Sequence, residues 1–164
     1  PDGSVYVSDT GNKRIQKFQP NGTFVTAWGT GGNGPGQLEE PMGLAVDAQG
    51  NVYVADTWNR RIQKFSSDGN FLSVISVGSW PASQTNTGEP SVGVTAAGQV
   101  VATDPLKSRV LVFGPDGNFQ TAFGGQGADP SSLNAPTGLA IAPNGNIVVS
   151  DSNNNRVVIF PAAK

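Results

Sequence analysis

The stretch NVYVADTWNRRIQKF, residues 51–65, decides the fold, because a version of it occurs four times in the chain. It begins with a short apolar run, continues through a polar turn that Asp56 opens and Arg61 closes, and ends in a second apolar run. This order is typical of a β-hairpin. The other copies are SVYVSDTGNKRIQKF, QVVATDPLKSRVLVF and NIVVSDSNNNRVVIF, at residues 4–18, 99–113 and 146–160.

The aspartate that opens the turn repeats at a fixed period. Its four copies, Asp9, Asp56, Asp104 and Asp151, are separated by 47, 48 and 47 residues. In the second unit the pattern predicts four strands, at residues 41–46, 51–55, 61–65 and 69–75. The whole chain divides into units of about 1–40, 41–88, 89–135 and 136–164. The first and last units are incomplete, and the predicted total is 3 × 4 + 2 = 14 strands.

The composition indicates an all-β protein without helices. The 164 residues include 22 Gly and 12 Pro, and only 13% are charged. Steps such as Asn21-Gly22 and Asp116-Gly117 predict tight turns between strands. The apolar runs are short and bounded by turn residues, which is strand length rather than helix length.

A four-stranded antiparallel unit repeated in tandem predicts a β-propeller, in which sheets pack radially against one another. The second strand of a unit supports this prediction. Val5, Tyr6 and Val7 are consecutive and all apolar, as are Ile147, Val148 and Val149. Successive strand residues point to opposite faces, so we expect both faces of this strand to be buried between sheets.

Several motifs recur in register: Pro-x-Gly-Leu-Ala-Val or Ile, Gly-Asn-Val or Ile-x-Val-x-Asp, and Asn-x-Arg-Ile or Val. In these motifs the chain resembles the NHL-repeat family, whose members are β-propellers, most often six-bladed. The resemblance implies that residues 1–164 form a single propeller region of about 3.5 to 4 blades. We expect this region to be a fragment of a larger ring, closed by further blades of the same polypeptide or by other copies.

The third copy departs from the pattern. Ser91 stands where the second and fourth copies have Gly43 and Gly138, and Lys107 replaces an asparagine found in the other three copies. Asp104 is followed by Pro105. We expect this blade to be retained, because its apolar runs are kept, but with an altered turn geometry.

The sequence contains no histidine and no cysteine, which excludes His-based or thiolate catalysis and disulfides within it. A net charge of −2 disfavours a nucleic-acid partner. No membrane-spanning run is present in the sequence, and no cofactor is expected. The low charge and the lack of cysteine favour an extracytoplasmic location.

One rim of the predicted propeller collects the long and variable segments. It carries the turns that run from Asp to Arg, at residues 9–14, 56–61, 104–109 and 151–156, which we call the Asp–Arg turns. It also carries the Gly-rich connections between units, at residues 30–40, 78–89 and 124–134. The opposite rim has only tight turns. We therefore expect binding on the first rim, which we call the connection face.

The charged pairs of the Asp–Arg turns have two interpretations. They could form a ring that holds a cation or a polar substrate, or each pair could be a structural bracket within its blade. An active site is needed once, whereas a bracket is needed in every blade, so repetition favours the structural role. The predicted bracket residues are Asp9, Arg14, Asp56, Arg61, Asp104, Arg109, Asp151 and Arg156.

Four residues that do not repeat are the candidate binding residues. Trp58 lies in an Asp–Arg turn and Trp80 in a Gly-rich connection, so both are expected on the connection face. Exposed tryptophan is favoured for stacking on sugars or for anchoring a protein interface, although each could instead cover a loop of its own blade. Arg60 and Lys107 lie beside the same turns and are expected to be solvated surface charges.

Two classes of function remain. The first is a non-enzymatic recognition or scaffold module that uses the connection face to bind a protein or glycan partner. The second is part of a propeller enzyme, because some lyases and lactonases that resemble this family work at a metal in the central channel. In that case the metal ligands or catalytic residues would lie outside this segment, because the segment has no histidine.

Overall fold

A computed structural model describes residues 2–83 and 89–162 of the chain. These residues contain 14 strands, as predicted, in four antiparallel sheets. Residues 84–88, within the predicted connection 78–89, lie outside the described residues. The strands are β1 (Val5–Asp9), β2 (Arg14–Phe18) and β3 (Phe24–Trp28) in the first sheet; β4 (Pro41–Val46), β5 (Val52–Asp56), β6 (Arg61–Phe65) and β7 (Phe71–Ser76) in the second; β8 (Val92–Val94), β9 (Val100–Asp104), β10 (Arg109–Phe113) and β11 (Phe119–Gly124) in the third; and β12 (Pro136–Ile141), β13 (Ile147–Asp151) and β14 (Arg156–Phe160) in the fourth.

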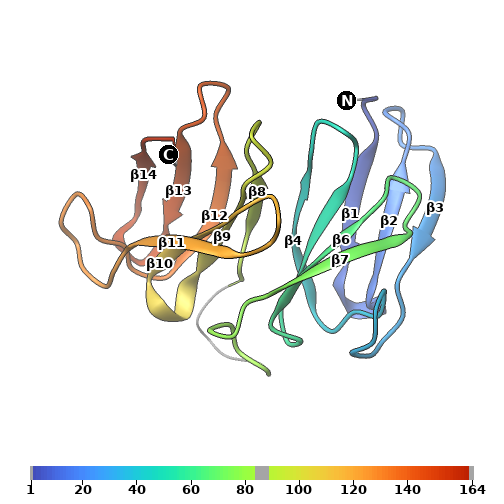
Figure 1. Ribbon diagram of the computed structural model, residues 1–164, viewed down its shortest axis with the longest axis horizontal. Helices are drawn as coiled ribbons and strands as arrows, with labels where there is room; N and C mark the ends of the chain where they lie inside the picture. The colour runs from blue at the N-terminus through green and yellow to red at the C-terminus, as the bar shows by residue number, and fades with distance from the viewer. Residues whose placement is uncertain (1, 84–88, 163–164) are drawn as a thin grey trace.

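Within each sheet the strands lie in chain order, and each strand pairs with the next one along the chain. The sheets are therefore up-and-down units that resemble propeller blades, and we call them the first to the fourth blade. Figure 1 shows them side by side, with several tight turns toward the top of the view. The chain passes from one blade to the next at the other end, which is the connection face. The predicted all-β fold is confirmed.

Apolar clusters fill the spaces between neighbouring blades. Val52 and Val54 of β5 belong to the cluster shared with the first blade. The alternate residues Tyr53 and Ala55 belong to the cluster shared with the third blade. All five residues of β5 are buried, so the predicted burial of both faces is confirmed for the second blade. A third cluster joins the last two blades.

The two terminal blades each leave one apolar face open. Val5 and Val7 are 49% and 41% exposed, because no described residue packs over that face of the first blade. The expectation that this strand is buried on both faces is therefore wrong for the described part of the chain. On the outer face of the fourth blade, Val157 and Ile159 are each 63% exposed. Exposed apolar faces of this kind mark surfaces that other protein elements cover.

Three of the four Asp–Arg turns contain short 3-10 helices: η1 (Thr10–Asn12), η2 (Pro105–Lys107) and η3 (Ser152–Asn154). The expectation of no helix was therefore wrong, since three residues are too few to show helical spacing in a sequence. The turn of the third blade keeps the same backbone geometry as the others, which corrects the expected alteration. Ser108 ends it at φ 51°, as Asn155 does in the fourth blade. Pro105 takes the first position of η2, where its missing N–H costs no hydrogen bond.

Candidate functional site: the connection face

The bracket of the second blade is a buried network centred on Asp56. The Asp56 side chain is fully buried, and its Oδ2 accepts hydrogen bonds from Arg61 Nε at 2.6 Å and Gln63 Nε2 at 3.0 Å. Its Oδ1 accepts the backbone N–H of Glu39 at 2.6 Å, and Asn59 donates to both oxygens. A buried carboxylate is tolerated where it is paired and fully hydrogen-bonded, as it is here.

Arg61 extends this network to the first Gly-rich connection. Its two terminal nitrogens donate to the backbone carbonyls of Asn33, Gly34 and Gln37 at 2.7–2.9 Å. These carbonyls lie in the segment that leads from the first blade into the second. The guanidinium therefore clamps the connection onto the blade that follows it, which is the structural role expected of the bracket.

The fourth blade repeats the arrangement. Arg156 Nε donates to Asp151 at 2.7 Å, and its terminal nitrogens donate to three carbonyls of the connection that precedes the blade. Burial raises the pKa of Asp151, but hydrogen bonds from Asn154, the Asn134 N–H and Arg156 outweigh it, and the net shift is downward. The carboxylate is therefore held in its charged form by its partners.

The first blade keeps three side-chain partners for its aspartate, because Asn12 and Gln16 also donate to Asp9, whereas the third blade keeps the ion pair alone among the described residues. Arg14 Nε lies 2.7 Å from Asp9, and Arg109 Nε lies 3.0 Å from Asp104. Asp104 is fully buried, yet its Oδ1 has no hydrogen-bond partner among the described residues. The asparagine that serves this oxygen in the second blade is replaced by Lys107, so the sequence departure changes the hydrogen bonds of the turn while its backbone stays the same.

The structure contradicts the prediction for Trp80. This residue is only 2% exposed and belongs to the apolar cluster between the second and third blades. Its indole Nε1 donates to the carbonyl of Thr103 at 3.0 Å. Trp80 is therefore a core residue of the blade interface, and it cannot be a surface anchor for a partner.

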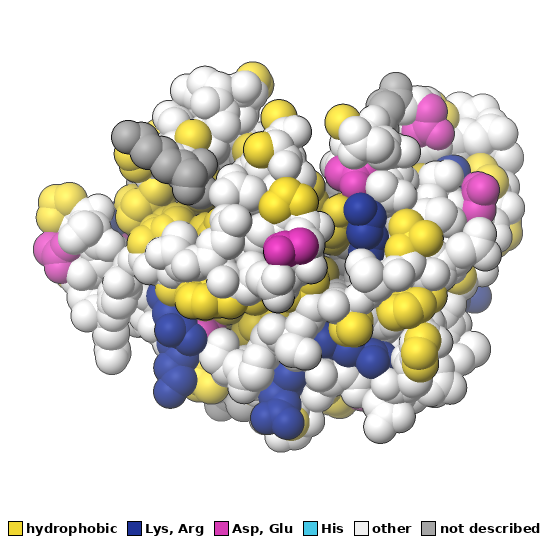
Figure 2. All heavy atoms as spheres, viewed as in Figure 1, with side chains coloured by type: hydrophobic (Ala, Val, Ile, Leu, Met, Phe, Trp, Pro, Cys, Tyr) yellow, Lys and Arg dark blue, Asp and Glu magenta, His cyan; other side chains and the backbone are white. Residues whose placement is uncertain are grey.

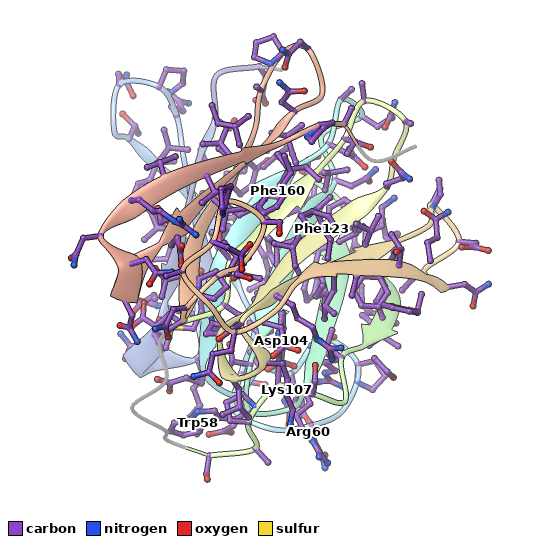
Figure 3. All side chains as sticks on the ribbon, turned by 90° about the vertical axis from the view of Figure 1, so that its left-hand side faces the viewer. Trp58, Arg60, Asp104, Lys107, Phe123 and Phe160 are labelled. Carbon is purple, nitrogen blue, oxygen red and sulfur yellow. The ribbon has the colours of Figure 1, made fainter. Side chains whose placement is uncertain are left out.

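The other candidate residues do lie on the connection face. Figure 3 places Trp58, Arg60 and Lys107 toward the same lower end of the molecule. Trp58 is partly exposed, whereas Arg60 and Lys107 are exposed. Figure 2 shows several Lys and Arg side chains along that lower edge. Arg60 occupies the left-handed turn position at φ 53°, so its backbone is fixed while its side chain faces solvent.

A cavity of about 450 Å³ lies where the four blades converge at this face. Residues from the ends of β1 and the beginnings of β4, β8 and β12 line it, so it lies on the inner, channel side of the blades. We call it the channel cavity. Its lining is composed of small, hydroxyl-bearing and glycine residues together with one carboxylate: Ser8, Thr10, Met42, Gly43, Glu89, Pro90, Ser91, Thr137 and Gly138.

Hydroxyl groups at the cavity link one blade to the next. Ser8 Oγ donates to the carbonyl of Met42 at 2.6 Å, and Thr10 Oγ1 donates to the carbonyl of Pro41 at 2.7 Å. The sequence interpretation missed these residues, because serine and threonine are ordinary in turns. A signal was available: Ser8 and Thr103 occupy the same place, directly before the bracket aspartate. Thr103 Oγ1 likewise donates to Thr137 of the next blade, at 3.3 Å.

Gly43 is needed where the second and third blades meet at the cavity. A Cβ added at this position would lie 2.7 Å from the Cα of Ser91 and 2.8 Å from the carbonyl oxygen of Pro90. Real Cβ atoms do not approach backbone that closely, so only glycine allows the two strands this contact.

Within residues 2–83 and 89–162 no group of three or more acidic, His or Cys side chains could hold a metal ion. None of the described helices is long and apolar enough to cross a membrane.

Comparison with protein families identifies the repeats. The family described as NHL repeat matches residues 38–65 and 133–160, which are the ends of the first and third Gly-rich connections with the hairpins that follow. The chain therefore contains NHL repeats, and the two matched segments lie in its second and fourth blades. A search of curated protein sequences finds no match.

Solved structures share the fold at low sequence identity. A streptogramin B lyase matches 99% of the chain with a TM-score of 0.66 at 15% identity. A catalytically inactive virginiamycin B lyase from Staphylococcus aureus with quinupristin matches with a TM-score of 0.65 at 13% identity. A protein of unknown function from Bacteroides caccae matches at 0.58 and 16% identity. The chain spans about half the length of these proteins, 52–57%.

Proposed function

We propose that this chain is a non-enzymatic recognition or scaffold module that binds a protein or glycan partner on its connection face. The channel cavity is the observation that carries the proposal. It is about 450 Å³ in volume, and residues from all four blades line it. Concave sites with a few polar groups are the usual places where proteins bind ligands.

The chemistry of the face supports binding rather than catalysis. The repeated charged groups are held in ion pairs, and the bracket carboxylates of the second, third and fourth blades are buried. The cavity lining contains one ionisable side chain, Glu89. The catalytically inactive lyase carries alanine in place of a histidine, and histidine is a residue type that this sequence lacks.

A second candidate is part of a propeller enzyme with a lyase-like or lactonase-like activity. The specific observation in its favour is the fold similarity to a streptogramin B lyase, which the chain matches over about half of that protein. The metal ligands or catalytic residues would then lie outside this segment. Titrating a longer protein that contains these residues with Ca²⁺ and Zn²⁺ distinguishes the two: tight, stoichiometric binding that stabilises the fold would contradict the scaffold proposal.

The open faces of the terminal blades support a need for further blades, either of the same polypeptide or of other copies. Large, exposed apolar side chains lie on both ends of the described region: Val157 and Ile159 on one, and Val5 and Val7 on the other. We expect the isolated 164-residue chain to associate or to be poorly soluble. Sedimentation velocity tests this, and a stable, monodisperse monomer would contradict it.

Binding on the connection face is tested with arrays of glycans and peptides. Binding to any hit should fall at least about tenfold in a Trp58→Ala, Arg60→Ala or Lys107→Ala variant, as truncation of interface anchors usually gives. Gln49→Ala is the matched control, because Gln49 is exposed in a tight turn on the opposite rim. Loss of binding in the control alone, or in none of the four variants, would contradict the assignment of the face.

A further inference from the structure

We propose that the channel cavity accepts a protonated amine, such as the side chain of a lysine that a protein partner inserts. This inference rests on the proposed recognition function of the connection face and names the chemical group that enters its centre. It follows from the direction of the hydrogen bonds around the cavity and from the charge of its lining.

The hydroxyl groups at the edge formed by the first and second blades use their protons in hydrogen bonds within the protein. Ser8 Oγ donates to the carbonyl of Met42, and Thr10 Oγ1 donates to the carbonyl of Pro41. A hydroxyl has one proton and two lone pairs. Once the proton is used, the oxygen can only accept a further hydrogen bond. Both residues line the cavity, so this edge presents acceptors to a ligand.

The third and fourth blades add few donors to the lining. The hydroxyls of Thr137 and Ser152 lie 2.6 Å apart and share one hydrogen bond, which uses the proton of one of them, and only Thr137 lines the cavity. Behind the lining, the buried Thr103 Oγ1 accepts the Ser91 N–H and donates to the Thr137 carbonyl. The hydroxyl protons open to a ligand are therefore at most those of Ser91 and Thr137, and the acceptor oxygens of Ser8, Thr10 and Glu89 outnumber them.

The charge of the lining has the matching sign. Glu89 is the single charged residue among the described residues that line the cavity, and it is exposed. Lys13, which follows the lining residue Thr10 by three positions, is paired with Glu39 at 2.5 Å. An ammonium group has three donors and no acceptor, so it suits a lining of acceptor oxygens with one carboxylate. An anion would meet like charge and find few donors.

The shape of the cavity also suits the end of a long side chain that enters from outside. Gly43 and Gly138 contribute no side chains to the lining. At Gly138 an added Cβ would lie 2.7 Å from the Ser150 hydroxyl, so a larger residue does not fit there. A cavity of about 450 Å³ has room for a lysine side chain with several water molecules.

The test is a titration of a longer protein that contains these residues with Nα-acetyl-lysine methylamide, followed by NMR chemical shifts. The control ligand is Nα-acetyl-norleucine methylamide, which has an alkyl side chain of similar length without the ammonium group. We expect the lysine compound to bind at least about tenfold more tightly, because a charge-assisted hydrogen bond adds more than a neutral one. Equal binding of the two compounds, or tighter binding of a neutral methyl glucoside, would overturn the proposal.

Variants locate the site. Glu89→Gln should weaken binding of the lysine compound about three- to tenfold, and Thr137→Lys should abolish it by placing a competing ammonium in the cavity. Glu40→Gln is the matched control, since Glu40 lies on the same face, outside the lining and outside the ion pairs of the described residues, and should have little effect. Unchanged binding in both cavity variants would overturn the proposal. If glycans or other peptides bind the face while the lysine compound does not, this inference fails and the proposed function stands.

Discussion

The first and the second Gly-rich connections are held to the next blade in different ways. The first is clamped by Arg61, which donates to three of its carbonyls, and by Leu38, which is fully buried. The second is anchored by Trp80, which is buried against the third blade and donates to the Thr103 carbonyl. Both connections are therefore held against the blade that follows them, the first by hydrogen bonds from an arginine and the second by a buried tryptophan. We call these two attachments the polar clamp and the aromatic anchor.

The replacement of the polar clamp by an aromatic anchor accompanies the incomplete bracket of the third blade. Arg109 pairs with Asp104, but the asparagine and glutamine that complete the second bracket are replaced by Lys107 and Leu111. Leu111 is instead part of the apolar cluster that contains Trp80. Toward the blade that precedes it, the second blade therefore has buried hydrogen bonds, whereas the third blade has apolar packing at the equivalent position. Four predictions test this difference between the two connections.

The largest effect is expected for Trp80→Ala. Removing a fully buried tryptophan from an apolar cluster should lower the free energy of unfolding by about 3–5 kcal/mol. Trp58→Ala is the control, because Trp58 is only partly buried, and it should change stability by less than about 1 kcal/mol. Urea unfolding of both variants measures the difference. Equal losses would show that Trp58 is also a packing residue and would remove it from the binding face.

Asp56→Ala should come next. The carboxylate serves Arg61, Asn59, Gln63 and a backbone N–H, and its loss leaves buried donors without partners, at a cost of about 3 kcal/mol. Asp104→Ala removes one ion pair from a network that is already incomplete, so its cost should be about 1 kcal/mol. Chemical denaturation compares the two variants. A larger loss in Asp104→Ala would contradict the division between the two fastenings.

The fourth blade, which has the same clamp as the second, gives a prediction for pH. Because the folded-state pKa of Asp151 is lowered from its ordinary value of 3.8, its ionised form stabilises the fold. That stabilisation is complete above the ordinary pKa and is lost as the pH falls through the lowered folded-state value. Asp151→Asn should cost about 1–3 kcal/mol at neutral pH and much less in strong acid. Unfolding curves across the acid range test this, and a pH-independent cost would contradict it.

The smallest expected effect is a gain. Lys107→Asn restores the residue that donates to the bracket aspartate in the second and fourth blades, and it should give Asp104 Oδ1 the partner it lacks among the described residues. The expected stabilisation is about 1 kcal/mol. Lys107→Ala removes the same charge without adding a donor and serves as the control. If both variants shift the melting temperature equally, the added hydrogen bond is not responsible.

The repeating features of the molecule could be predicted from the sequence. The period of the bracket aspartates, the strand positions and the pairing of Asp56 with Arg61 all follow from local patterns that occur several times. Each copy supports the others, so a single ambiguous strand does not change the result. The resemblance to NHL repeats rested on the same recurring motifs.

The features that were missed depend on contacts between blades. Trp80 looked exposed because it lies in a connection, and its burial depends on a carbonyl of the third blade that is 23 residues away. The lining of the channel cavity comes from four separate segments, and no local pattern joins Ser8 to Thr137. Such sites form only when the blades are placed around a common axis, which the sequence of one repeat does not specify.

Hydrogen exchange tests most directly the claim that the two connections are fastened separately. Asp56→Ala should increase exchange in residues 30–40, where the Glu39 N–H bonds to Asp56 and the Gly36 N–H to Gln63, and leave residues 77–83 unchanged. Trp80→Ala should do the reverse, since the backbone N–H of residue 80 bonds to the carbonyl of Val77, directly before the connection that the Trp80 side chain anchors. If Asp56→Ala left residues 30–40 protected, or if both variants exposed both connections alike, the two fastenings would not be distinct.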